Sequence, residues 1–392
     1  MIKILTFSTL FPNAARPNHG VFVETRLRHL VASGEVSARV LAPVPWFPST
    51  HPRFGEYARF ARAPRAEVRF GLQVDHPRYF LPPKVGMNIA PMLLALSAKR
   101  VIQRMLEAGE DFDLIDAHYF YPDGVAAVLL GQWFNKPVVI TARGTDINLI
   151  PQHTVPRKMI LWAARHAAGV ITVCQTLKDA IVALGIPPER IVVLRNGVDL
   201  NLFQPVEREA ERARFNLSRH TLLSAGNLVP VKGHDLIIRA LPALPDIDLL
   251  IAGEGPDKAM LTTLAAELGV ADRVRLIGAM PQAELRRYYG AVDALVLASS
   301  REGWANVLLE AMACGTPVIA SNVGGTPEVV ATPEAGVLMK ARTPEAIATS
   351  VNALFANYPE HSATRRYAEQ FSWDDTTAGQ LKLFRAILAR QT

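Results

Sequence analysis

The chain has 392 residues, 49% of them hydrophobic and 20% charged, which is enough for two globular domains. No stretch approaches the roughly 20 apolar residues of a transmembrane helix. The two cysteines, Cys174 and Cys314, are too few for a disulfide framework. These features exclude a helical membrane protein and a disulfide-rich secreted protein. The first apolar run, Ile4–Phe11, ends at Pro12 without a cleavage site, so we interpret it as a strand and expect a cytoplasmic protein.

The net charge of +6 is unevenly distributed. Residues 1–200 contain 23 basic and 15 acidic residues, a net +8, whereas residues 201–392 contain 19 and 21, a net −2. Basic and aromatic residues alternate in the first half, namely Arg53, Arg59, Arg62, Arg65, Arg69, Arg78 and Lys84 with Phe54, Tyr57, Phe60, Phe70, Tyr79 and Phe80. Such a surface fits an anionic membrane face or a phosphorylated acceptor, or is only solvated. No nucleic-acid-binding motif accompanies the charge, so we expect no nucleic acid.

Short apolar runs alternate with helical patterns along the whole chain. The runs in the first half are Ile2–Phe7, Ala38–Ala42, Leu114–Ala117, Pro137–Thr141, Gly169–Val173 and Ile191–Leu194. Those in the second half are Thr221–Ala225, Asp248–Ala252, Val274–Ile277, Ala294–Ala298 and Pro317–Ala320. Continuous apolar strands separated by helices indicate parallel sheets covered on both faces. The sequence therefore predicts an α/β fold of two doubly wound, Rossmann-like domains facing a central cleft.

A charged stretch over residues 204–220 interrupts this alternation. We therefore predict a first domain over residues 1–205 and a second over residues 206–372. The remaining residues, 373–392, form a helix over Trp373–Arg390 whose packing partner the sequence does not indicate.

In open α/β sheets, ligands bind at the carboxyl ends of the strands. The loop after Thr221–Ala225 contains Gly226, Asn227 and, beside the next helix, Lys232. A lysine at a helix N-terminus is suited to phosphate. The loop "GEGPDK" at residues 253–258 has Lys258 where a dinucleotide fingerprint has its third glycine, which argues against a nicotinamide dehydrogenase. Two acidic triplets, Asp111–Asp113 and Asp246–Asp248, stand at strand starts, so we expect no metal and no cofactor.

Two carboxylates flank the start of a short apolar helix in "REGWANVLLEAMACGTPVIAS", residues 301–321. Glu302 precedes the helix and Glu310 lies inside it among apolar neighbours. Between them the amides of Ala305–Val307 are expected to be the unpaired donors of a helix N-terminus. Burying Glu310 without partners is costly, and the hydroxyls of a bound ribose would supply them. This pattern predicts a phosphate site flanked by two carboxylates that accept hydrogen bonds from ligand hydroxyl groups.

These residues resemble glycosyltransferase family 4, retaining enzymes of the GT-B fold. The matching pattern is Glu302, Gly303, Glu310, Ala311, Ala313, Gly315, Pro317 and Val318, and "NGVDLNLF", "GNLVPVKGH", "AGEGP" and "NVGGTPEVV" also match in order. The resemblance implies a donor that is a nucleotide-diphosphate sugar. It implies that Glu302 holds donor-sugar hydroxyls, that Glu310 binds ribose and that Lys232 binds the diphosphate. It further implies that amides near Asn306 and Val307 contact phosphate, that the loop Ile277–Met280 meets the base, and that Gly20 opens the acceptor-side helix Val21–Leu30.

The sequence departs from the family pattern in three places. Asn227 stands where an arginine of the phosphate site is usual, so part of that site is either missing or supplied elsewhere, for which Arg301 and Arg143 are the candidates. The double glycine of the first loop is His19–Gly20 here. Arg143 replaces a histidine that contacts the transferred sugar in relatives, and either Arg143 or His118 takes that role. The motifs "TARGTD" and "PDG" are similar to the branch that builds bacterial surface polysaccharides such as teichuronic acid.

We therefore expect a retaining glycosyltransferase in which the acceptor hydroxyl attacks on the face of the leaving diphosphate. The expected acceptor is a polyprenyl-linked or polysaccharide intermediate at the inner, anionic membrane face, where the protein would dock peripherally. A GT-B nucleotide-sugar epimerase and a non-catalytic sugar-binding protein remain the alternatives. The base, the sugar and the linkage are left open by the sequence.

Overall fold

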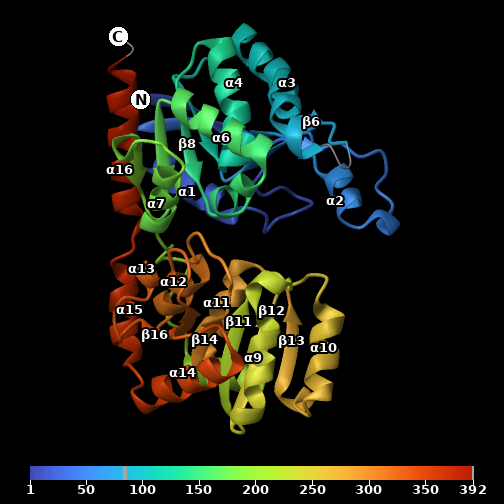
Figure 1. The fold of residues 1–392 in the computed structure, drawn as a ribbon, viewed down its shortest axis with the longest axis vertical. Helices are drawn as coiled ribbons and strands as arrows, with labels where there is room; N and C mark the ends of the chain where they lie inside the picture. The colour runs from blue at the N-terminus through green and yellow to red at the C-terminus, as the bar shows by residue number, and fades with distance from the viewer. Residues whose placement is uncertain (83–85, 391–392) are drawn as a thin grey trace. The chain divides into compact units, whose positions relative to one another are not determined.

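The computed structural model describes residues 1–82 and 86–390 (Figure 1). The chain divides into two compact units, one formed by Met1–Arg195 with Asp374–Thr392 and the other by Asn196–Trp373. The first unit thus ends before the boundary predicted at residue 205, and it includes the C-terminal helix. Lys84, one of the basic residues of the aromatic segment, lies outside the described residues.

Unit 1 is built on an eight-stranded sheet with strand order β10-β9-β8-β7-β1-β2-β5-β4. The strands are β1 (Ile2–Phe7), β2 (Val36–Leu41), β4 (Ala66–Arg69), β5 (Leu72–Asp75), β7 (Leu114–His118), β8 (Val138–Ala142), β9 (Gly169–Thr172) and β10 (Ile191–Val193). All neighbours are parallel except β4 and β5, which form a hairpin closed by Phe70 and Gly71, both with positive φ. A separate pair, β3 (Val44–Pro45) and β6 (Arg78–Tyr79), completes the strands described in this unit.

Unit 1 also contains α-helices. They are α1 (Val21–Ala32), α2 (Glu56–Arg62), α3 (Gly86–Glu107), α4 (Val125–Phe134), α5 (Thr145–Asn148), α6 (Thr154–His166), α7 (Gln175–Ala183) and α16 (Trp373–Leu388). Of these, α2 packs on β3 and not on the eight-stranded sheet. The C-terminal helix α16 packs beside α1: Leu381, Phe384 and Ile387 share one core with Val23 and Leu27. Figure 1 shows α16 running along unit 1 although it comes last in the chain.

Unit 2 has a six-stranded, fully parallel sheet with strand order β13-β12-β11-β14-β15-β16. The strands are β11 (His220–Ala225), β12 (Ile247–Ala252), β13 (Val274–Gly278), β14 (Ala294–Leu297), β15 (Val318–Ser321) and β16 (Gly336–Met339). The helices are α8 (Arg208–Phe215), α9 (His234–Ala240), α10 (Lys258–Glu267), α11 (Gln282–Ala291), α12 (Asn306–Ala313), α13 (Thr326–Val329), α14 (Pro344–Ala356) and α15 (His361–Glu369). The prediction of an α/β fold with two Rossmann-like domains is confirmed.

Three strands of the two large sheets that the sequence analysis did not select lie at or next to a sheet edge. β4 and β16 are edge strands, β5 lies between β2 and β4, and none of the three is a fully buried apolar run. An edge strand is exposed on one side, so its residues alternate or mix in polarity instead of forming a continuous apolar block. Within residues 1–82 and 86–390, no helix is both long and apolar enough to cross a membrane.

Candidate active site

The carboxyl edge of the unit 2 sheet is a set of loops joined by backbone hydrogen bonds. The amide of Gly226 donates to the Ala252 carbonyl at 2.9 Å, and Ser300 donates to Val231 at 2.8 Å. Gly253 has φ of +156°, and a Cβ there would lie 1.9 Å from the Gly226 oxygen. Only glycine fits at this position, so the loops after β11 and β12 approach more closely than side chains would allow.

Lys232 and Glu302, which the sequence analysis selected separately, contact each other at this edge. The Lys232 Nζ lies 2.6 Å from Glu302 Oε1, and the two side chains are 25% and 12% exposed. The lysine stem runs past Gly226, where a Cβ would lie 3.4 Å from its Cε. An ammonium has three donors, so two remain for phosphate oxygens once Glu302 is bonded.

The N-terminus of α12 differs from the expectation in one respect. The helix begins at Asn306, and the Asn306 amide donates to the Trp304 carbonyl at 3.2 Å. The prediction that this amide is unpaired is therefore wrong. The Asn306 side chain accepts from Asn196 Nδ2 at 3.2 Å. Gly303 is buried, and its carbonyl accepts from the Gly325 amide at 3.2 Å. Val307, in the first turn of α12, is only partly buried.

Glu310 is buried in α12 with an exposed fraction of 8%. Its Oε2 accepts from the Tyr289 hydroxyl at 3.0 Å, and its Oε1 accepts from Gln282 Nε2 at 3.0 Å. Burial raises the pKa of Glu310 to about 7, and the two hydrogen bonds oppose that rise. The expectation that only a ligand would satisfy this carboxylate is therefore wrong, because the protein itself supplies two donors.

The remaining donor-side positions also lie at this edge. Ile277 is the next-to-last residue of β13, and Met280 follows that strand. Both are partly buried. The carbonyl of Asn227 accepts from His234 Nε2 at 3.2 Å. Arg342, which the sequence analysis did not select, donates to the Ala298 and Pro230 carbonyls beside Gly233. Arg342 is far from the glycine-rich loops in sequence, so no local pattern indicated that it belongs to this site.

In unit 1 the predicted acceptor-side glycine is tightly constrained. Gly20 has φ of +72°, and a Cβ there would lie 2.3 Å from the Leu10 carbonyl oxygen. In the same loop, Thr9 donates through its amide and its hydroxyl to Asp123 Oδ2 at 2.8 and 2.9 Å. Asp123 is fully buried, and this burial raises its pKa to about 8. The "PDG" motif was the only sequence signal for this carboxylate.

His118 and Arg143 meet at the carboxyl ends of β7 and β8. Arg143 NH2 lies 2.7 Å from His118 Nδ1, and His118 Nε2 lies 3.3 Å from Asp116 Oδ2. A guanidinium only donates, so Nδ1 accepts and Nε2 carries the ring proton. His118 is 1% exposed, and burial lowers its pKa to about 4, which keeps the ring neutral. Both ring nitrogens are engaged, so the arrangement favours Arg143 over His118 for ligand contact.

A buried polar chain connects this pair to the C-terminal helix. Gln380 of α16 donates to Asp116 Oδ2 at 2.9 Å and accepts from Arg26 Nε at 3.1 Å. Gln380, Asp116 and Arg26 are each 1% exposed. The C-terminal helix thus supports the Asp116–His118–Arg143 arrangement from behind.

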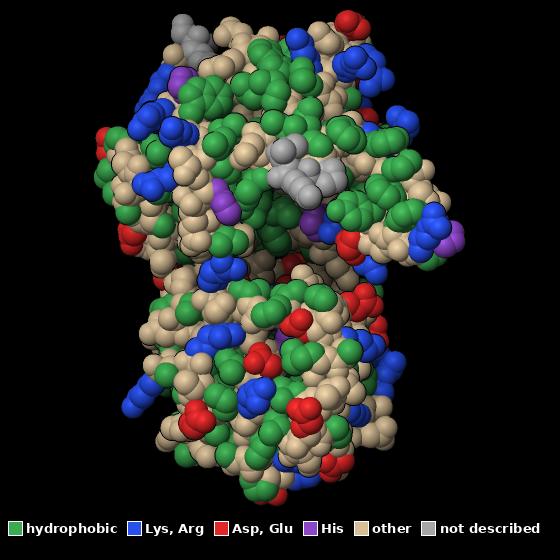
Figure 2. All heavy atoms as spheres, turned by 45° about the vertical axis from the view of Figure 1, so that its right-hand side comes forward, with side chains coloured by type: hydrophobic (Ala, Val, Ile, Leu, Met, Phe, Trp, Pro, Cys, Tyr) green, Lys and Arg blue, Asp and Glu red, His purple; other side chains and the backbone are tan. Residues whose placement is uncertain are grey.

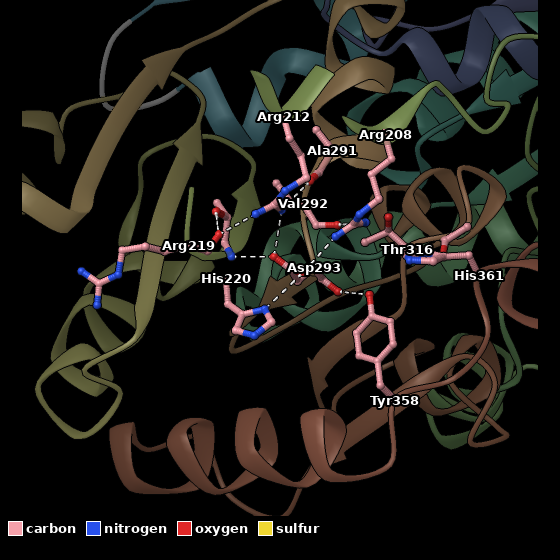
Figure 3. Close-up of polar contacts among 12 residues, drawn as sticks. Arg208, Arg212, Arg219, His220, Ala291, Val292, Asp293, Thr316, Tyr358 and His361 are labelled. Carbon is pink, nitrogen blue, oxygen red and sulfur yellow. Dashed lines mark hydrogen bonds and ion pairs between the residues drawn. The ribbon is translucent and has the colours of Figure 1, made fainter. Parts of the chain in front are cut away.

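The opposite, amino edge of the unit 2 sheet carries an ion cluster around Asp293 (Figure 3). Asp293 accepts from Arg208 at 2.8 Å, from Arg212 at 3.2 Å and from the Thr221 amide at 2.7 Å. An open hollow of about 430 Å³ lies beside the cluster. Both arginines also donate to the carbonyls of Val292 and Ala291, so the cluster fastens α8 to the sheet.

The acidic triplets also lie at amino edges, away from the loops described above. Asp111 pairs with Lys136 at 2.8 Å, and Asp113 accepts from the Lys3 amide at 2.7 Å. Asp246 and Asp248 each lie 3.7 Å from Arg219. Asp111, Asp246 and Asp248 thus lie beside basic side chains at the strand starts, and Asp113 is bonded to a backbone amide.

Two solved structures that resemble the whole chain define its fold. One is sucrose-phosphate synthase from Thermosynechococcus elongatus, with 20% identity, a TM-score of 0.80 and 100% of both chains covered. The other is Anabaena Alr3699/HepE in complex with UDP, with 20% identity, a TM-score of 0.73, and 98% of this chain and 100% of that chain covered. The fold is that of the GT-B glycosyltransferases.

Sequence comparison gives the family. The model for glycosyl transferases group 1 matches residues 206–371, and the model for glycosyltransferase family 4 matches residues 56–202. The D-inositol 3-phosphate glycosyltransferase 1 of Catenulispora acidiphila is 29% identical over 98% of this chain and 96% of its own length. The D-inositol 3-phosphate glycosyltransferase of Thermobispora bispora is 31% identical over 74% of this chain and 73% of its own length. The chain belongs to glycosyltransferase family 4 and is a glycosyltransferase whose donor is a nucleotide sugar.

Proposed function

We propose that the chain transfers a sugar, with retention of anomeric configuration, from a nucleoside diphosphate sugar to a lipid-linked, phosphate-bearing intermediate of cell-surface glycan synthesis. The contact between Lys232 and Glu302 carries the donor half of this proposal. It places a cation and a carboxylate side by side at the carboxyl edge of the sheet, where a diphosphate and the adjoining sugar hydroxyls need opposite partners.

The donor groups divide the nucleotide sugar among them. Lys232 neutralises the diphosphate, and Glu302 orients the lysine while accepting from sugar hydroxyls. Glu310, at the next helix, accepts from the ribose hydroxyls with the lone pairs that Tyr289 and Gln282 leave open. Ile277 and Met280 border the base.

The reaction proceeds on one face of the sugar. The acceptor oxygen bonds to the anomeric carbon as the bond from that carbon to the diphosphate oxygen breaks. The departing diphosphate takes the proton of the acceptor hydroxyl, so no protein nucleophile is required. The chain contributes positioning and charge stabilisation, with Lys232 on the leaving group and Arg143 on the acceptor-side unit.

The acceptor half rests on an exposed apolar surface of unit 1. This surface consists of Trp46, Tyr57, Phe80, Leu81, Met87, Ile89, Met92 and Leu96, each at least 39% exposed. Ile89, Met92 and Leu96 are three and four residues apart, so they lie on one face of α3. Figure 2 shows green hydrophobic side chains gathered on this part of unit 1, with blue basic side chains at its margin.

The exposed apolar surface favours a membrane-borne acceptor over a small soluble one. Apolar side chains insert into the interface of a bilayer, and nearby arginines are attracted to its anionic lipids. Arg53, Arg62 and Arg65 are exposed in the same segment. Arg69 is not part of this contact, because it is paired with buried Glu24 at 2.6 Å. This surface supports the proposal that the protein is cytoplasmic and binds peripherally to the inner membrane face.

The names of two relatives suggest a soluble acceptor instead, because they specify D-inositol 3-phosphate. The deciding experiment supplies UDP-, ADP- or GDP-sugars with either a polyprenyl-phosphate-linked acceptor in anionic vesicles or D-inositol 3-phosphate in solution. Release of nucleoside diphosphate only with the vesicle acceptor supports the proposal. Turnover with inositol phosphate alone overturns the lipid-linked acceptor, and a product with inverted configuration overturns retention.

A further inference from the structure

The surroundings of Glu310 contain a residue that the family resemblance did not point to. Tyr289, in α11, is 0% exposed, and its hydroxyl donates to Glu310 Oε2 at 3.0 Å. Gln282, at the first position of the same helix, donates to the other oxygen at 3.0 Å and is partly exposed. The carboxylate is therefore held by one buried donor and one donor at the surface.

Further contacts hold Tyr289 in this position. Its carbonyl accepts from the Thr316 hydroxyl at 2.6 Å, which links α11 to the start of β15. Its ring lies 6.1 Å from that of Phe203, which is also buried. Burial raises the pKa of Tyr289, so the phenol keeps its proton and remains a donor.

The two hydrogen bonds leave acceptor sites for a diol on the carboxylate. An ionised carboxylate has about four lone-pair sites, and Tyr289 and Gln282 use one on each oxygen. Each oxygen therefore keeps one site, which matches the two vicinal hydroxyls of a ribose. Protonating Glu310 would convert one of these acceptors into a donor and weaken binding of both hydroxyls.

We propose that Tyr289 is a positioning residue that keeps the Glu310 carboxylate ionised and oriented for the ribose of the donor nucleotide, with Gln282 as a weaker second support. The proposal rests on the donor site described under the proposed function. It assigns to Tyr289 the selection of ribose-bearing nucleotides near neutral pH.

The ionisation of Glu310 is set by few groups. Besides Tyr289, α11 presents Arg286, which donates to the Leu202 carbonyl. Cys314, the C-cap residue of α12, interacts electrostatically with Glu310, and burial raises its pKa to about 12, so it stays neutral. On α15, Arg365 donates to the carbonyls of Phe203 and Ala313. Strands β14 and β15 carry no titratable side chain, and no ion pair with Glu310 occurs among residues 1–82 and 86–390.

The direction of the pH effect follows from these contacts. Burial raises the pKa of Glu310 to about 7, and the hydrogen bond from Tyr289 lowers it. Removing the phenol hydroxyl therefore raises that pKa further, by about one pH unit for a hydrogen bond to a charged group. If nucleotide binding needs ionised Glu310, the variant reaches full affinity only at a higher pH than wild type.

The test measures dissociation constants of UDP, ADP and GDP by calorimetry between pH 6 and 9 for wild type and Tyr289→Phe. For the nucleotide that wild type binds best, we expect Tyr289→Phe to bind about five-fold more weakly at pH 7 and nearly as well at pH 9. At each pH, the dissociation constant of the variant is divided by that of wild type. Ionisation of the nucleotide affects both constants equally, so it does not affect this ratio. The preference for the ribonucleotide over its 2′-deoxy analogue should show the same pH dependence.

Two further variants keep the test interpretable. Tyr288→Phe is the matched control, because Tyr288 stacks on Phe215 at 3.9 Å and does not contact Glu310, so its ratio should stay flat. Gln282→Ala removes the second donor from a partly exposed position, so it should fold even if Tyr289→Phe does not, and should shift the profile in the same direction. If Tyr289→Phe and Gln282→Ala both lose nucleotide affinity equally at every pH, or lose none, the positioning role of Tyr289 is overturned. The proposed donor site is not affected by that result. Failure of wild type to bind any of the three nucleotides overturns the donor site as well.

Discussion

The ammonium of Lys232 and the carboxylate of Glu302 lie 2.6 Å apart, although 70 residues separate them in the chain. The contact holds the lysine at a fixed position. In the donor site that we propose, the lysine would not have to be ordered by the substrate, which is the condition for strong electrostatic stabilisation of a leaving diphosphate.

Lys232→Ala and Glu302→Ala should each reduce turnover by about 100-fold or more, the scale for losing one charge-stabilising group. The double variant should lose much less than the product of the two single losses, because the residues act as a unit. Initial rates of nucleoside diphosphate release check this. Lys382→Ala, an exposed lysine of α16, is the control. Near-normal turnover in both single variants would contradict the assignment.

Turnover should not require a divalent metal. The acidic triplets lie at the amino edges of both sheets, paired with Lys136 and Arg219, whereas Lys232 is available to the leaving diphosphate at the carboxyl edge. Initial rates after treatment with a chelator should match untreated rates within about two-fold. Loss of activity with chelator, restored by magnesium or manganese, would refute this prediction.

Membrane docking should depend on the exposed apolar surface and weaken with salt. Changing Phe80, Met92 and Leu96 together to Ser should reduce sedimentation with anionic vesicles by about ten-fold, since each removes an inserting side chain. Changing Arg59, Arg62 and Arg65 to Gln should mainly reduce the salt sensitivity. Met260→Ser is the matched control, because Met260 is 45% exposed on α10 of unit 2. Vesicle binding that survives both multiple substitutions would place the contact elsewhere.

The stability of the protein should carry a pH dependence that originates at Asp123. The folded pKa of Asp123 is about 8, far above its ordinary value of 3.8. Between these two pH values the folded state binds a proton that the unfolded state releases, so this group makes the fold less stable as pH rises from about 4 to 8. Asp123→Asn should remove that slope. Melting temperatures of both proteins at pH 5, 6, 7 and 8 test it, and parallel curves would contradict it.

Asp293 should be important for the stability of unit 2. Asp293→Ala leaves Arg208 and Arg212 without their carboxylate, and we expect a loss of about 3 kcal/mol in the free energy of unfolding. Asp246→Ala is the control, because its carboxylate is 91% exposed and only 3.7 Å from Arg219, and it should cost less than about 0.5 kcal/mol. Denaturant unfolding compares the two. Equal effects would mean that the cluster around Asp293 has no special role.

The sequence alone was enough to predict the two α/β domains and the edge of the second sheet where donor residues gather. Buried parallel strands are continuous apolar runs, so β1, β7, β8, β11, β12 and β14 were visible without any tertiary information. The carboxyl ends of parallel strands share one edge, so Gly226, Lys232 and Glu302 could be assigned to the same region from their order in the chain. The edge strands β4 and β16 lacked this signal because one side of each is not covered, and β5, next to the edge, alternates buried with more exposed residues.

Only the tertiary structure decided which of these side chains contact one another. Glu310 was visible as a charge on an apolar helix, but its donors Tyr289 and Gln282 come from a different helix, whose packing no local pattern describes. The same holds for α16, whose period shows a helix but not that Gln380 reaches Asp116, 264 residues earlier. Periodicity in the sequence records which residues are buried, whereas the partner of a buried polar group depends on how distant elements pack, and that is fixed only when the chain folds.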